Sequence, residues 1–91
     1  MPITRKQFEL GIDSEIEEWM KKIHSFLSEH KDQAFSEGEL RESLGLKLPT
    51  PVKEIKAFEA ALDKIVGLGV AEERLILDKS YYSQGRKPLP V

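Results

Sequence analysis

Two histidines, His24 and His30, are the residues of this 91-residue chain that most readily suggest chemistry. They lie six positions apart, which turns them about 600° around a helix, whereas two metal ligands on one helix need a spacing of three or four. The chain has no cysteine, which excludes a thiolate ligand, a disulfide and a thiol nucleophile. The sequence therefore predicts neither a metal site nor a cofactor.

Other catalytic patterns are missing from the sequence as well. No serine stands in a glycine-serine-glycine elbow, no glycine-rich run matches a phosphate-binding loop, and no paired carboxylates mark a cleft. The run Gly67-Leu68-Gly69 is typical of a helix end. We therefore expect that the chain is not an enzyme.

The basic side chains are the remaining candidates for a binding role. The net charge of −2 disfavours strong binding to nucleic acid, because phosphate neutralisation usually needs a basic surface. The charges are nevertheless uneven, since residues 11–30 are mainly acidic and residues 79–91 carry only basic charges. The candidates for phosphate contacts are Lys53, Lys56, Arg74, Lys79, Arg86 and Lys87. The alternative, ordinary solvated surface charge, stays open for each of them.

These side chains must be positioned by a small set of helices and strands. Residues 1–12 show no clear period and are expected to form an arm. Ser14 and Glu17 make a capping-box pattern, and apolar residues then recur every three or four positions, which predicts a helix over residues 14–30. A second capping box at Ser36 and Glu39 predicts a helix that ends at Gly45.

A third helix and a hairpin complete the predicted elements. Thr50 followed by Pro51 is a start signal for a helix that runs to about Leu68. The segments 70–77 and 80–83 have strand composition and predict a hairpin, with a very short strand possible at Ala34-Phe35. The tail 84–91 is expected to lie along the surface or to be mobile.

The apolar spacing also predicts which residues form the core. Tyr81 and Tyr82 are adjacent, so in a strand one should point inward and the other outward. The expected core residues are Ile16, Trp19, Met20, Ile23, Phe26, Leu27, Leu40, Leu44, Ile55, Phe58, Leu62, Ile65 and Val70.

Residues 12–83, most of the chain, resemble the winged helix-turn-helix superfamily. The resemblance rests on a leucine-glycine pair closing the second helix, on apolar spacings in the third helix and on a glycine leading into the hairpin: Leu40-x-x-x-Leu44-Gly45, then Phe58-x-x-x-Leu62-x-x-Ile65-x-x-x-Gly69-Val70. It implies an α+β fold, a small winged-helix domain with three helices followed by a β-hairpin wing. The implied parts are an arm over 1–12, the domain over 13–83 and a tail over 84–91.

The resemblance also implies a function. It suggests a DNA-binding module, a transcriptional regulator that contacts duplex through the third helix and the wing. Two features depart from the family pattern. Residues Leu46–Ala57 are extra to the pattern, which predicts a lengthened loop at Leu46–Pro49 and about two added turns at the front of the third helix. Glu59 and Asp63 lie on the helix face that would meet DNA.

The alternative function is protein contact by the same kind of domain. In that reading the chain forms a homodimer or a subunit of a larger complex through its N-terminal arm and first helix, with Phe8, Trp19 or an exposed wing tyrosine in the interface. No apolar run approaches the ~18 residues that span a bilayer, and the first residues lack an apolar stretch of signal-peptide length. We therefore expect a cytoplasmic protein without a membrane partner.

Overall fold

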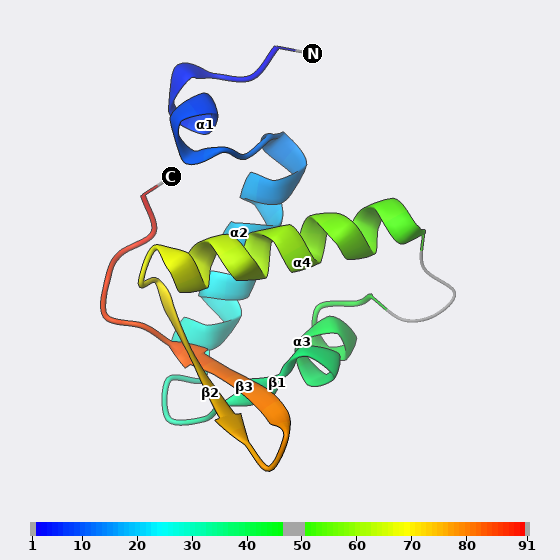
Figure 1. The fold of residues 1–91 in the computed structure, drawn as a ribbon, viewed down its shortest axis with the longest axis vertical. Coiled ribbons are helices and arrows are strands. Elements are labelled where there is room, and N and C mark those ends of the chain that lie inside the picture. Colours follow the sequence, from blue (N-terminus) through cyan, green and yellow to red (C-terminus); the bar gives the residue numbers. More distant parts are fainter. Residues whose placement is uncertain (1, 47–50, 91) are drawn as a thin grey trace.

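The computed structural model describes residues 2–46 and 51–90 and has an α+β fold, as the sequence predicted. The described residues form four helices and a three-stranded antiparallel sheet, packed together (Figure 1). Their bounds are α1 Arg5–Leu10, α2 Ser14–Glu29, β1 Phe35–Ser36, α3 Glu37–Ser43, α4 Val52–Gly67, β2 Ala71–Ile76 and β3 Lys79–Gln84.

Helix α1 corrects the prediction of an irregular arm over residues 1–12. The Gln7 amide donates to Thr4 Oγ1 at 3.1 Å, and the Thr4 amide donates to Gln7 Oε1 at 2.9 Å, which is a complete capping box. Gly11 ends the helix in the left-handed region at φ 73°. Gln7 is buried, and its side-chain amide donates to Ser14 Oγ and to Glu17 Oε1, both at 3.4 Å. These bonds join α1 to α2.

Helices α2 and α3 begin where the sequence predicted, but the residue that caps α2 differs from the predicted one. Helix α2 is capped by Asp13, whose Oδ1 accepts from the Ile16 amide at 2.9 Å, and not by Ser14. Helix α3 begins with the predicted capping box, in which the Ser36 amide donates to Glu39 Oε1 at 2.9 Å. The expected short strand pairs at Phe35 and Ser36, one residue later than predicted.

Helix α4 crosses α2, and the core lies between them (Figure 1). The Phe58 ring meets the Trp19 ring edge-on at a centroid distance of 5.7 Å, and Phe58 is fully buried. Ile55 is only half-buried, which corrects its place in the expected core. Ile16, Phe26 and Leu44 are partly buried and pack against that core. The remaining expected residues are buried, together with Ile12, Leu46, Ala57, Ala61 and Ala71. Helix α4 begins at Val52 with Pro51 at its N-cap, one residue later than the predicted start, and the predicted cap residue Thr50 lies outside the described residues.

The sheet has the order β1-β3-β2, with Tyr82 of β3 between Phe35 of β1 and Glu73 of β2. Tyr82 packs against the core, and Tyr81 lies on the opposite face of β3, as the alternation predicted. Tyr81 is half-buried there, which corrects the expectation of an exposed wing tyrosine. The tail lies along the surface. The Gly85 amide donates to the Val70 carbonyl at 2.8 Å and the Lys87 amide to the Gly69 carbonyl at 3.1 Å.

Replacing Phe58 by alanine should lower the free energy of unfolding by about 3–5 kcal/mol, because a large, fully buried ring is removed. Chemical denaturation followed by the fluorescence of Trp19, the single tryptophan, measures the change directly. The matched control is Val52→Ala, which lies exposed on the same helix and should change stability by no more than about 0.5 kcal/mol. Equal losses for the two variants would contradict the assigned core.

Candidate contact surface of helix α4 and the hairpin

The six cationic candidates do not gather into one patch. Lys53 and Lys56 are exposed on the first two turns of α4. Arg86 and Lys87 are exposed beyond β3, beside Gly69 at the other end of that helix. A helix of 16 residues is about 24 Å long, so its length separates the two pairs.

The two hairpin cations each lie close to carboxylates. Arg74 Nη2 lies 3.9 Å from Glu72 Oε2, and Arg74 Nη1 donates to the Glu73 carbonyl at 3.0 Å. The Arg74 side chain is 73% exposed, so this ion pair contributes little to stability. Lys79 is the first residue of β3, and its charge acts on Glu39 of α3. Because both hairpin cations lie near carboxylates, the hairpin presents no net basic surface.

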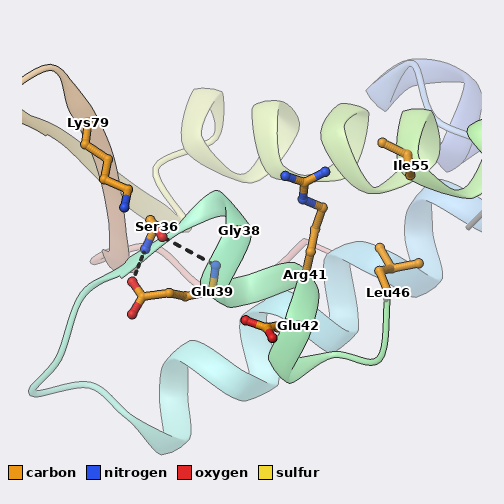
Figure 2. A pocket seen from close by; sticks show the side chains of 8 residues that line it. All are labelled: Ser36, Gly38, Glu39, Arg41, Glu42, Leu46, Ile55 and Lys79. Carbon is orange, nitrogen blue, oxygen red and sulfur yellow. Dashed lines mark hydrogen bonds between the residues drawn. The ribbon is translucent and has the colours of Figure 1, made fainter. Parts of the chain in front are cut away.

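A hollow of about 530 Å³ lies beside α3, with Lys79 on one side and Ile55 of α4 on the other (Figure 2). The pKa of Glu39 in this hollow is lowered, first by its bond from the Ser36 amide, then by the Ser36 hydroxyl, with a smaller effect of the Lys79 charge. Arg41, a cation that is not among the six candidates, also lines the hollow. Its Nη2 lies 3.9 Å from Glu37 Oε2. The mixed charges of this hollow favour neither anions nor cations.

The space between α4 and the hairpin is acidic. A hollow of about 300 Å³ there is lined by Glu59, Asp63, Tyr82 and also by Glu37 of α3. The Tyr82 hydroxyl donates to Glu73 Oε2 at 3.2 Å. We call Glu37, Glu59, Asp63 and Glu73, with Tyr82 among them, the acidic groove.

The pKa of Tyr82 reports the field in the acidic groove. Burial raises it most, the Glu73 charge and hydrogen bond raise it further, and the charges of Glu37 and Asp63 add to the effect, so that the pKa reaches about 12. All three carboxylates act in the same direction, because each disfavours a second negative charge at the phenol oxygen. This groove is therefore a region of negative potential.

The far end of the hairpin is apolar and uncovered. Leu75, Ile76 and Leu77 are 72%, 52% and 96% exposed, and we call these three residues the apolar tip. The turn lies at the opposite end of the molecule from α1 (Figure 1). Leu77 and Asp78 both have positive φ, at 50° and 66°, as in the two-residue type I′ turn that usually holds asparagine and glycine. A leucine there carries strain of roughly 1–2 kcal/mol.

Residues 2–46 and 51–90 contain neither a metal-binding cluster nor a membrane-spanning helix. No three histidine, aspartate or glutamate side chains gather there in an arrangement that could hold a metal ion. None of the helices in those residues has the length and hydropathy needed to cross a bilayer.

Comparison with known proteins assigns no family. A scan against protein-family models and searches of curated proteins and of solved structures all gave no match to this chain. The geometry of the acidic groove, the apolar tip and the separated cations is therefore the basis for inferring function.

Tyr82 should titrate near pH 12, about two units above an ordinary tyrosine, in a spectrophotometric titration of the phenolate. Because the folded pKa is raised above that of the unfolded chain, stability should be full below pH 10 and fall as the pH rises from 10 to about 12. Glu73→Gln should lower the Tyr82 pKa by removing a negative neighbour. Tyr82→Phe is the control that identifies the Tyr82 transition, and an unchanged titration in Glu73→Gln would contradict the described contact.

Leu77→Asn should raise the free energy of unfolding by about 0.5–1 kcal/mol, because asparagine adopts positive φ at lower cost and the leucine side chain packs on almost nothing. Thermal and urea denaturation measure the gain. Leu75→Asn is the control at a neighbouring exposed site with extended backbone, where no strain is relieved. A loss of stability in Leu77→Asn would show that Leu77 contributes packing in the folded chain.

Proposed function

We propose that this chain is a protein-interaction domain of the winged helix-turn-helix type, and that it binds its partner through the hairpin. The element order supports the type: a helix, a short strand, two helices and a hairpin whose last strand pairs with the first strand. The role is one of binding without catalysis, in the cytoplasm.

The acidic groove is the observation that carries the proposal. In a winged helix-turn-helix protein that binds DNA, the third helix and the wing face the duplex. Here the corresponding elements, α4 and the hairpin, enclose Glu59, Asp63 and Glu73 around Tyr82. Duplex DNA carries one negative charge for about every 1.7 Å of its axis. Bringing these carboxylates against it would be repulsive.

The apolar tip supports protein contact independently of charge. Exposed apolar residues that are grouped together commonly mark interaction sites, and interface centres are poor in charged residues. Leu77 adds a second signal, because it is 96% exposed and strained where glycine or asparagine would be relaxed. A residue that costs stability and gains no packing in its own chain is consistent with a contact made elsewhere.

DNA binding is the second candidate, favoured by one observation. Lys53 and Lys56 lie at the start of α4, where the free amides of a helix N-terminus also attract anions. In that role the chain would be a transcriptional regulator, and Arg74, Lys79, Arg86 and Lys87 would add phosphate contacts from the hairpin and tail.

Titration of labelled duplex at about 50 and 200 mM salt decides between the two candidates. We expect no binding to a mixed-sequence duplex at the lower salt. Glu59→Gln with Asp63→Asn should create measurable binding, because the double variant removes two charges from the groove without adding a cation. Binding by the wild type that falls with salt and is lost when Lys53, Lys56, Arg86 and Lys87 become glutamine would overturn the proposal.

A further inference from the structure

Strand β2 is an edge of the sheet. In the order β1-β3-β2 it pairs with β3 on one side only. An edge strand presents unpaired amides and carbonyls that can pair with another strand. The alternation of an antiparallel ladder identifies which residues of β2 present them.

The two-residue turn fixes that alternation. Ile76 and Lys79 flank the turn at Leu77 and Asp78, so they form a pair that exchanges hydrogen bonds. At the other end of the ladder the Gly85 amide donates to the Val70 carbonyl at 2.8 Å. Residue 70 is an even number of positions from residue 76, so this bond agrees with the alternation set by the turn. Residues 70, 72, 74 and 76 therefore bond toward β3. The backbone groups of Ala71, Glu73 and Leu75 point toward the free edge.

A two-fold symmetric pairing of two copies can use all three outward residues in only one register. Glu73 must lie opposite Glu73 of the second copy, and Ala71 opposite its Leu75. This register places each exposed Leu75 opposite Ala71, whose side chain is buried in the core of its own chain. It also places each Ile76 opposite Val70, which is buried as well, so the edge hydrogen bonds and the charges, and not apolar contacts, favour this register.

The same register is complementary in charge. On the other face of the strand, Arg74 lies directly opposite Glu72 of the second copy, and symmetry repeats this pair. Both side chains are substantially exposed in the single chain, at 73% for Arg74 and 42% for Glu72, and so are free to reorient. Opposite charges facing each other across antiparallel strands are stabilising. The two Glu73 carboxylates, which face each other in this register, repel one another and weaken the association.

We infer that a second copy of this chain pairs antiparallel with the free edge of β2, in the register centred on Glu73, and so joins two sheets into one. This inference rests on the proposed protein-interaction role and names the partner. Its interface is short, which places it in the weak, reversible class.

Sedimentation velocity over roughly 10 to 500 µM tests the association, the range suited to a weak interface. A reversible monomer–dimer equilibrium is expected. Arg74→Glu should weaken dimerisation about tenfold or more, since it replaces two attractive pairs by two repulsive ones. The double variant Glu72→Arg with Arg74→Glu restores both pairs and should recover dimerisation, and Glu73→Gln should strengthen it. A chain that stays monomeric throughout, or a dimer indifferent to these variants, overturns the inference.

Disulfide trapping tests the register. The chain has no cysteine, so a single Glu73→Cys change introduces one thiol, and two opposed residues in a bonded pair lie about 5.5 Å apart, within the range of a disulfide. Glu73→Cys should crosslink rapidly under mild oxidation. Leu75→Cys, on the same face and edge, should not, because its opposite residue is Ala71. Faster crosslinking at residue 75 overturns the register.

The two proposals fail in different experiments. Salt-sensitive duplex binding removes the protein-interaction role whatever the oligomeric state. A monomer that ignores duplex leaves that role in place and removes only the second copy as partner.

Discussion

The packing of α4 across α2 is the interaction on which the rest of the structure depends. Phe58 lies fully buried against the edge of Trp19, with Met20 and Ile23 of α2 buried in the same cluster. A domain of this size buries only a little over half of its unfolded surface, so few residues can replace this contact. The hairpin follows from it, because the Val70 amide donates to the Ile65 carbonyl at 2.9 Å and Gly69, at φ 79°, turns the chain out of α4 into β2.

The arrangement of α4 and the hairpin separates the basic candidates from one another and brings four acidic residues together, although both kinds are scattered in the sequence. The six basic candidates lie at the two ends of α4 and on the hairpin, where they face solvent or nearby carboxylates. The acidic residues Glu37, Glu59, Asp63 and Glu73 come from three elements and meet around Tyr82. A net charge of −2 hides this separation, and the separation is what favours a protein partner over a nucleic acid.

Much of the fold could be predicted because its signals are local. Apolar spacing located α2 and α4, and the capping box at Ser36 located α3. The polar pair Asp78-Lys79 indicated the hairpin turn one residue later than its observed place at Leu77 and Asp78. Helix α1 was missed because six residues make fewer than two turns and show no period, and its only signal is the cap at Thr4 with Gln7. Asp13 and Ser14 both suit the N-cap position, so the sequence alone did not distinguish them. In the fold Asp13 caps α2, and the Ser14 hydroxyl accepts a hydrogen bond from the Gln7 side chain of α1.

The candidate site could be predicted only where it lies on one element. Glu59 and Asp63 are four residues apart on a helix, so their shared face was evident, whereas Glu37 and Glu73 reach the groove through tertiary packing. The apolar tip was also missed, because a strand-like run of Leu75, Ile76 and Leu77 does not tell whether the fold covers it. Their exposure is a property of the sheet order, which leaves β2 at an edge and its turn beyond the helices.

Residue-resolved NMR of the backbone amides on dilution tests most directly whether two copies of the chain pair through the hairpin. Spectra of the wild-type chain, recorded at decreasing concentration under otherwise fixed conditions, should show progressive shifts of the Glu73 and Leu75 amides, which point to the free edge. The Arg74 amide, bonded to β3, should move less. Concentration-independent spectra, or shifts confined to α1 and α2, would contradict the pairing of two copies through the hairpin.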